Sequence, residues 1–164
     1  MPQRPGHSLD LYVLPEFGVA LPEAAALNHA LLRAGIAEGR RPGDAAERVV
    51  VGGYAGVRID RPGSEQLYAN GQGGFRVTCS HCDTSVIREF QRALTAWRGG
   101  ADRALVCPQC ARSSDLAALS YRPPAGFAHG AVVLIDAQHS VLTDQGKTAF
   151  KAVLGDVRVV GARR

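Results

Sequence analysis

Four cysteines in two short motifs are the residues of this chain whose type and spacing could do chemistry. The first motif, "CSHC", spans residues 79–82, and the second, "CPQC", spans residues 107–110. One Cys-x-x-Cys motif could form a redox-active pair, whereas two such motifs can supply four thiolates to one tetrahedral metal ion. The second motif therefore favours a metal site. The predicted metal ligands are Cys79, Cys82, Cys107 and Cys110.

Zinc is the metal that this ligand set favours, and iron is the alternative, because iron and iron–sulfur sites also use four thiolates. The two motifs are separated by 24 residues. This connection is longer than the usual range of about 15 to 20 residues, and a helix within it would account for the difference. Four sulfur ligands leave zinc no open position for a substrate. The sequence thus predicts one structural zinc ion.

Residues 77–111 resemble the zinc-ribbon family, whose two knuckles bind one structural zinc. The family knuckle often reads Cys-Pro-x-Cys-Gly, which "CPQCA" matches except that Ala111 replaces the glycine, while "CSHCD" has neither the proline nor the glycine. Asp83 tolerates a positive φ better than Ala111, so we expect the second turn to deviate. A connecting helix is another departure, since zinc ribbons commonly join their knuckles with β-hairpins. The resemblance implies a zinc site at the four cysteines and no particular partner.

Three histidines and one aspartate are further candidates for metal ligands or catalytic groups. His81 lies within the first motif and could replace a thiolate, but an exposed turn residue is the better interpretation. His29 lies on a predicted helix and is expected either to face solvent or to be a satisfied histidine without a ligand role. Asp136 and His139 follow an apolar strand, where α/β enzymes often hold catalytic groups, yet no nucleophile is identifiable beside them. No catalytic residue is predicted.

Two glycine-containing stretches are reminiscent of phosphate-binding loops but do not fit that pattern. A phosphate loop ending in "GKT" (residues 146–148) would need glycine at position 141, where Val141 stands, and would have to precede its helix. Lys147 instead falls inside a predicted helix. The stretch "GQGGF" (residues 71–75) is better explained as the turn of a hairpin. We therefore predict no nucleotide cofactor.

The elements that must position the cysteines follow from hydrophobic periodicity and turn signals. Residues 85–97 place apolar side chains on one helical face, and "RALVC" returns as a strand over 103–107. Before them the sequence predicts a strand at 9–15, a helix at 22–34, a loop at 38–47, a strand at 48–59 that a turn or bulge interrupts at Gly52-Gly53, and a hairpin at 67–79. After them it predicts a brief helix at 115–121, irregular backbone at 122–127, a strand at 130–136, a helix at 143–154 and a strand at 157–161.

Both terminal parts of the chain read as strand–helix–strand. Helices on one face of a sheet would bury both apolar sides, so the predicted fold class is α+β, a ferredoxin-like two-layer sandwich with an inserted zinc-ribbon-like segment that contains a helix. We predict a single α+β domain over residues 1–164, with an inserted zinc-binding subdomain at 76–112. The strand order and the oligomeric state are not predicted.

The composition limits the classes of protein to consider. With 46% hydrophobic and 21% charged residues among 164, the chain is typical of a globular protein. The first residues do not fit the pattern of a secretory signal and no apolar stretch reaches about 20 residues, so we expect a cytoplasmic protein that does not enter a membrane. The formal charge of +4 becomes +2 when four thiolates and one Zn²⁺ add −2. This modest charge permits nucleic-acid binding without requiring it.

These observations predict a non-enzymatic zinc-binding protein whose insert binds another protein. The alternative is a nucleic-acid-binding zinc-ribbon protein, and the second alternative is a thiol redox protein with a thioredoxin-like pair. Phe75, Phe90 and Trp97 could stack on bases, but Phe90 and Trp97 share the helical face expected to be buried. The basic end "RVVGARR" could contact phosphates, although a solvated tail is the simpler interpretation.

Overall fold

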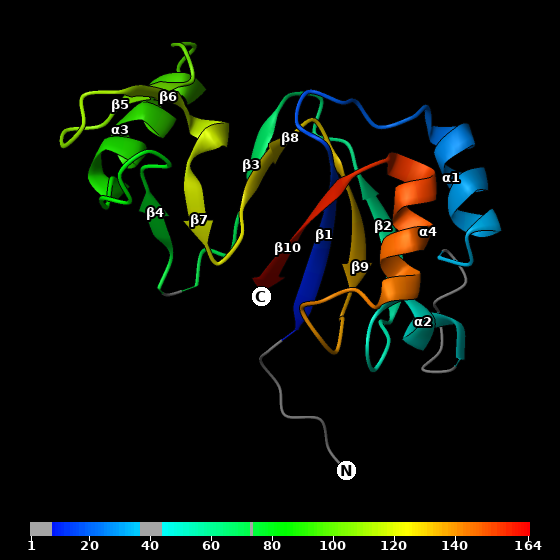
Figure 1. Cartoon of the computed structure of the whole chain (residues 1–164). Coiled ribbons are helices and arrows are strands. Elements are labelled where there is room, and N and C mark those ends of the chain that lie inside the picture. The colour runs from blue at the N-terminus through cyan, green and yellow to red at the C-terminus, as the bar shows by residue number, and fades with distance from the viewer. Residues whose placement is uncertain (1–7, 37–43, 73) are drawn as a thin grey trace. The chain divides into compact units, whose positions relative to one another are not determined.

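The computed structural model describes residues 8–36, 44–72 and 74–164, and the chain forms two compact units. The sheet unit comprises Met1–Gln72 and Ala125–Arg164, and the cysteine unit comprises Gly73–Pro124. Figure 1 labels their helices and strands. The predicted division into one domain over 1–164 with an insert at 76–112 stays a prediction, and each unit is described here by itself.

The sheet unit is built on four antiparallel strands in the order β10-β1-β9-β2. A separate antiparallel pair joins β3 to β8. The predicted mixture of helices and strands is confirmed. Its elements are β1 (Leu9–Pro15), α1 (Ala24–Arg33), α2 (Asp44–Val49), β2 (Gly56–Asp60), β3 (Gln66–Tyr68), β8 (Gly126–Ala128), β9 (Ala131–Ile135), α4 (Asp144–Leu154) and β10 (Val157–Arg163).

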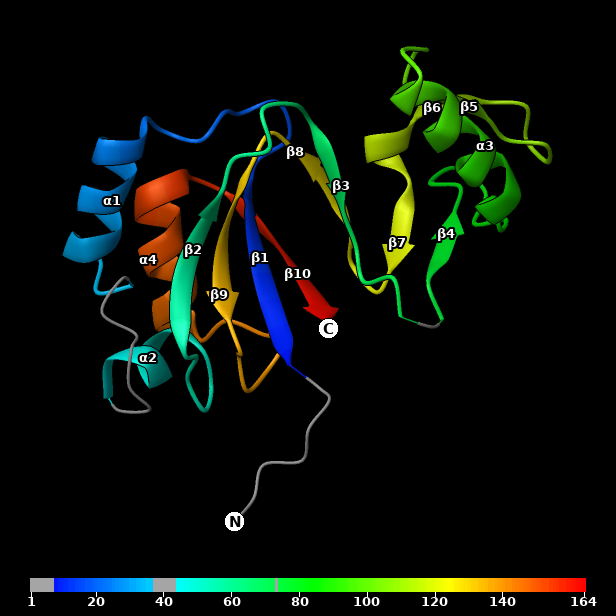
Figure 2. The same cartoon turned by 180° about the vertical axis from the view of Figure 1, so that it is seen from behind.

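Alternation along the strands gives this sheet two apolar faces. Leu11 and Val13 of β1 lie in the larger core, which α1, α2 and α4 cover from one side in Figures 1 and 2. Tyr12 and Leu14 point the other way and pack in a second cluster that includes Tyr68 of β3. The rings of Tyr12 and Tyr68 lie 5.3 Å apart. The sheet unit therefore has a continuous apolar interior on both sides of β1.

The helices begin and end where the sequence places capping residues. In α1 the Glu23 carboxylate accepts hydrogen bonds from Ala25 and Ala26, at 3.0 and 3.4 Å, and Gly35 follows the helix with φ 72°. In α4 the Thr143 hydroxyl accepts a hydrogen bond from the Gly146 N–H at 3.0 Å. The predicted helices at 22–34 and 143–154 are thus confirmed to within two residues.

The glycine of "GKT" has a packing role. A Cβ at Gly146 would lie 2.3 Å from the backbone oxygen of Val49, which is closer than any side chain tolerates. The backbone of α4 therefore approaches the end of α2 more closely than any other residue would allow. Lys147 lies within α4 and is exposed, as expected of a stretch that is not a phosphate loop.

Three predicted elements of the sheet unit are wrong in part. Residues 38–43 of the predicted loop lie outside the described residues, but Asp44–Val49 is a helix. Of the interrupted strand predicted at 48–59, only Gly56–Asp60 is a strand; a turn lies at Val51–Gly52, close to the interruption predicted at Gly52-Gly53, and before it Val50 makes only an isolated bridge. The hairpin predicted at 67–79 does not form, since β3 pairs with β8 and β4 with β7. Distant strands thus compete successfully with the local Asn-Gly turn signal.

The cysteine unit contains one α-helix and two short antiparallel pairs, β4 with β7 and β5 with β6. Its interior includes an aromatic group in which Phe90 of the helix lies 6.2 Å from Phe75 and 5.6 Å from Tyr121, measured between ring centroids. The elements are β4 (Arg76–Thr78), α3 (Ile87–Arg98), β5 (Ala104–Val106), β6 (Ser113–Asp115), the 3₁₀ turn η1 (Leu116–Ala118) and β7 (Ser120–Arg122).

The predicted helix between the cysteine motifs is confirmed as α3, and the strand at 103–107 as β5. The brief helix predicted at 115–121 is only the 3₁₀ turn η1, since Tyr121 already belongs to β7. The stretch 122–127 was expected to be irregular, yet both of its ends lie in strands, Arg122 in β7 and Gly126–Phe127 in β8.

None of the helices in the described residues combines the length and apolar character of a membrane span.

Candidate metal centre

The sulfur atoms of the four cysteines lie together, all within 4.8 Å of one another. The Sγ atoms of Cys79 and Cys110 are 3.8 Å apart, and those of Cys82 and Cys107 are 3.6 Å apart. A tetrahedron with metal–sulfur distances of about 2.3 Å has edges of about 3.8 Å. These distances exceed a disulfide bond and match the edges of a four-thiolate metal site. The cluster is therefore compatible with a structural metal centre.

The first cysteine turn is held by backbone hydrogen bonds directly after β4. The N–H of Asp83 donates to the Cys79 carbonyl, and the Cys79 N–H donates to the Thr84 carbonyl, both at 2.9 Å. The N–H of His81 points at the Cys79 sulfur at 3.4 Å. Asp83 has φ 57°, in the left-handed region. This closed turn directs both sulfurs of the motif to the same side.

The second turn repeats the first after a shift of 28 residues. The N–H of Ala111 donates to the Cys107 carbonyl, and the Cys107 N–H donates to the Arg112 carbonyl, again at 2.9 Å. Ala111 has φ 58°, almost the value of Asp83. The expectation that alanine would make this turn deviate is wrong. Its backbone bonds impose the left-handed conformation despite the steric cost of a Cβ.

The strands that carry the two turns also correspond. Thr78 bridges Ser85 across the first turn, and Val106 pairs with Ser113 across the second, so each cysteine pair sits at the tip of a small antiparallel loop. One step earlier in each strand, Val77 and Leu105 are buried. Each loop thus fixes its cysteines to the interior of the cysteine unit through an apolar side chain.

The surroundings of the sulfurs shift the pKa values of Cys82 and Cys110 in opposite directions. The hydroxyl and N–H of Thr84 favour the thiolate of Cys82 and lower its pKa to about 6. The N–H of Arg112 favours the thiolate of Cys110, but desolvation and hydrogen bonds with the other three sulfurs raise its pKa to about 11. Without a cation, four thiolates at these distances repel one another, and a divalent ion would remove that repulsion.

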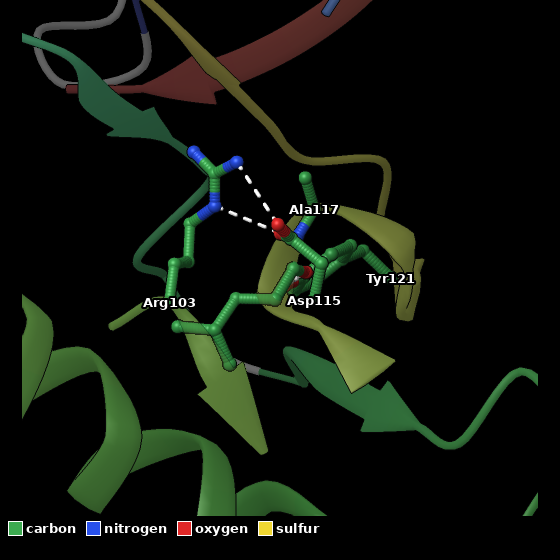
Figure 3. Close-up of polar contacts among 5 residues, drawn as sticks. Arg103, Asp115, Ala117 and Tyr121 are labelled. Atoms are coloured by element: carbon green, nitrogen blue, oxygen red, sulfur yellow. Dashed lines mark hydrogen bonds and ion pairs between the residues drawn. The ribbon is translucent and has the colours of Figure 1, made fainter. Parts of the chain in front are cut away.

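An ion pair closes the base of the second loop (Figure 3). Arg103 donates from Nε and Nη2 to the two carboxylate oxygens of Asp115, at 2.8 and 3.1 Å, and the N–H of Ala117 donates to Oδ1 at 2.8 Å. The Tyr121 hydroxyl donates to the carbonyl of Leu116 nearby. Partial desolvation opposes the charge of Asp115, but the bonds from Arg103 and Ala117 lower its pKa. These contacts tie β5, β6 and η1 together.

The other candidate residues do not join the cluster. The His81 ring is exposed, and its Nδ1 lies 3.4 Å from Nη1 of Arg112. His29 is exposed on α1, as expected. His139 is exposed, and Asp136 is half-buried with φ 51° at the turn after β9. Asp136 and His139 thus lie in a turn.

Sequence reasoning missed a buried carboxylate in the sheet unit. Asp10 is 1% exposed; its Oδ1 accepts hydrogen bonds from the Asp136 N–H at 3.2 Å and from Arg164 at 2.9 Å. The C-terminal end is therefore not a solvated tail, because β10 extends to Arg163 and Arg164 forms an ion pair. No signal in the sequence marks Asp10, since its partners lie more than a hundred residues away.

Comparison with known proteins adds no relative: no family model matches the sequence, and no match is found among curated proteins or solved structures. The arguments about function therefore depend on the residues of this chain.

Proposed function

We propose that Cys79, Cys82, Cys107 and Cys110 bind one structural zinc ion, and that the protein is a non-enzymatic binding protein whose cysteine unit this ion stabilises. The observation that carries the proposal is the spacing of the sulfur atoms, 3.6 and 3.8 Å across the two motifs. Such spacing suits a tetrahedral ion with four thiolate ligands. The two equivalent backbone turns support the same conclusion.

A structural role follows from the ligand set. Zinc sites that catalyse hydrolysis keep one position for water or substrate, whereas four protein sulfurs complete the coordination. The ion would supply charge neutralisation for the thiolates and link β4 and β5 through their following turns. Iron uses the same four-thiolate set in rubredoxin-like sites, so metal analysis has to name the ion.

A ferredoxin-like arrangement is our proposal for the sheet unit. Counting only the strands of its four-stranded sheet in chain order, the spatial order is fourth, first, third, second, with antiparallel neighbours. Helices α1 and α2 lie between the first and second strands, and α4 lies between the third and fourth. This is the split β-α-β pattern. The cysteine unit would then be an insert between its second and third strands, resembling a zinc ribbon with an added helix.

Metal analysis of the full-length protein tests the proposed site. We expect one equivalent of zinc, with four thiols that become reactive only after chelation. Iron at one equivalent would keep the four-thiolate site and change the metal. Two freely reactive cysteine pairs in a metal-free protein would overturn the proposal and favour the thiol redox alternative. A Thr84→Val variant, which removes the hydroxyl beside Cys82 and keeps all four sulfurs, should retain the metal.

A further inference from the structure

The outward side of α3 carries three arginines and no carboxylate. With 3.6 residues per turn, the exposed residues of this helix occupy an arc of about 160°. The one acidic residue of α3, Glu89, lies outside this arc and is half-buried. We call the exposed arc the arginine face. Its members are Arg88, Gln91, Arg92, Thr95, Ala96 and Arg98.

Two of these arginines do not serve the stability of the helix, whereas Arg98 stands in the last turn, where the helix dipole favours positive charge. Arg88 lies in the first turn of α3, where the helix dipole disfavours positive charge. Arg88 and Arg92 are four residues apart, and like charges at that spacing repel each other by a few tenths of a kcal/mol. Among the described residues, Arg88, Arg92 and Arg98 form no ion pair. Their charge is available to a partner.

The cysteine unit as a whole has an excess of positive charge. Including α3, it has seven arginines and four carboxylates, a formal +3 that four thiolates and one Zn²⁺ would lower to +1, and Arg103 pairs with Asp115. Arg76 and Arg122 stand directly opposite each other on β4 and β7, and both are exposed. Like charges in opposed positions destabilise a strand pair. Two separate elements thus tolerate repulsion that an anionic partner would relieve.

We propose that the arginine face binds the phosphate backbone of a nucleic acid. Guanidinium groups match phosphate oxygens in two-point hydrogen bonding, and a helix of about 10–12 Å diameter fits the major groove. Gln91, between two of the arginines, adds a side-chain amide of the kind that contacts base edges and phosphates. The proposal rests on the proposed function, because the metal fixes the turn from which α3 begins. The protein partner expected from the sequence becomes the competing outcome.

Binding of a short, labelled duplex DNA of random sequence by the full-length, metal-loaded protein tests this proposal. We compare the wild type with Arg88→Gln/Arg92→Gln/Arg98→Gln by fluorescence anisotropy across a salt series. The triple variant should bind about tenfold more weakly or worse near physiological salt. Its slope of log affinity against log salt should fall by about three, because each lost phosphate contact removes about 0.9.

A control variant, Arg33→Gln/Arg48→Gln/Arg163→Gln, removes the same charge from exposed positions of the sheet unit. It should stay within about twofold of the wild type and keep its salt slope. Equal weakening in both variants would mean a general charge effect and would overturn the assignment to α3. Loss of labelled polyglutamate binding in the α3 variant, with DNA binding unchanged, would also overturn it and indicate an acidic protein partner. Absence of DNA binding by the wild type would also overturn the proposal.

Metal content measured on the same samples separates this proposal from the preceding one. If wild type and both variants hold one equivalent of metal and only the α3 variant loses DNA binding, both proposals stand. If all three hold metal and bind DNA equally, the arginine face is wrong and the metal site stands. If the wild type lacks metal, the structural site fails, and the affinity ratio between the two variants still decides the role of the arginine face.

Discussion

The two units of the chain become compact by different means. The sheet unit surrounds a four-stranded sheet with apolar residues on both faces, including Leu11, Val132 and Phe150 on the helical side. The cysteine unit has two strand pairs of three residues per strand, one helix and a small aromatic group. Small units bury too little apolar area to offset their conformational entropy, and a metal is a common remedy. Apolar burial on two faces of a sheet thus holds the first unit together, whereas the second has a smaller apolar interior, which the metal site that we propose would supplement.

Removing one metal ligand should produce the largest difference between the units. We expect Cys107→Ser to lose on the order of 10 kcal/mol of metal-binding free energy, and the cysteine unit should unfold in consequence. Hydrogen exchange of the full-length protein, read by mass spectrometry, should show lost protection at β4, α3 and β5 and retained protection at β1 and β9. The control Val106→Ala changes an exposed neighbour that is not a ligand. One equivalent of metal and unchanged exchange in Cys107→Ser would contradict the comparison.

A cavity in the sheet unit should destabilise that unit and leave the metal content unchanged. Phe150 is fully buried against the sheet, and Phe150→Ala should cost about 3–5 kcal/mol of unfolding free energy. Urea denaturation followed by tyrosine fluorescence measures this loss. The neighbouring Lys151→Ala, at an exposed position, is the control and should change little. The metal content should remain that of the wild type. A release of metal in Phe150→Ala under native conditions would show that the two units do not unfold separately.

Alkaline pH should weaken the sheet unit by a smaller amount. Burial raises the pKa of Tyr54 to about 12, and its hydroxyl donates to the Ile36 carbonyl at 2.6 Å. Burial and the bond to Asp60 also raise the pKa of Tyr68. Below pH about 10 both states keep these protons, so the stability is complete. As pH rises towards about 12 the unfolded chain ionises first, and about 2 kcal/mol is lost for Tyr54.

The pH dependence of the urea midpoint checks this expectation. In Tyr54→Phe the loss between pH about 9 and about 11 should be smaller than in the wild type, because one of the two buried hydroxyls is absent. If the urea midpoint fell equally with pH in the wild type and in Tyr54→Phe, ionisation of Tyr54 would not contribute to unfolding of the sheet unit. The wild-type cysteine unit should stay protected from hydrogen exchange over the same range, since high pH favours its thiolates.

The sequence indicates the metal cluster better than it indicates the fold, for a physical reason. Both cysteine turns are closed by bonds within six residues, so their spacing in the chain reflects their geometry. Helices α1 and α4 were similarly predictable, because their caps and periodicity are local. Strand partners such as Leu67 and Phe127 are sixty residues apart, and nothing in either segment identifies the other. The expected hairpin at 67–79 failed for that reason.

The charge on α3 shows a different limit of sequence reasoning. Counting charges along residues 76–112 gives +3, six arginines against three carboxylates, which four thiolates and one Zn²⁺ would lower to +1; this count treats Arg103 and Arg88 alike. The structure separates them: Arg103 is paired with Asp115 in the base of the second loop, while Arg88 stands on an exposed helical face. A net charge does not show which carboxylates already form ion pairs with arginines. The burial of Asp10 escaped notice for the same reason, as its partners are set by the sheet.

Each unit has one strand pair close to the points where the chain passes to the other unit, which has a consequence for protein engineering. Tyr68 pairs with Gly126 in the sheet unit, and Arg76 pairs with Arg122 in the cysteine unit. Opposed residues of antiparallel strands have Cα atoms about 5 Å apart, so each unit presents two adjacent attachment points. A short turn could therefore bridge β3 and β8 if the cysteine unit were excised. The excised segment, with neighbouring ends, has the form of a cassette that could be transplanted into a surface loop of another scaffold.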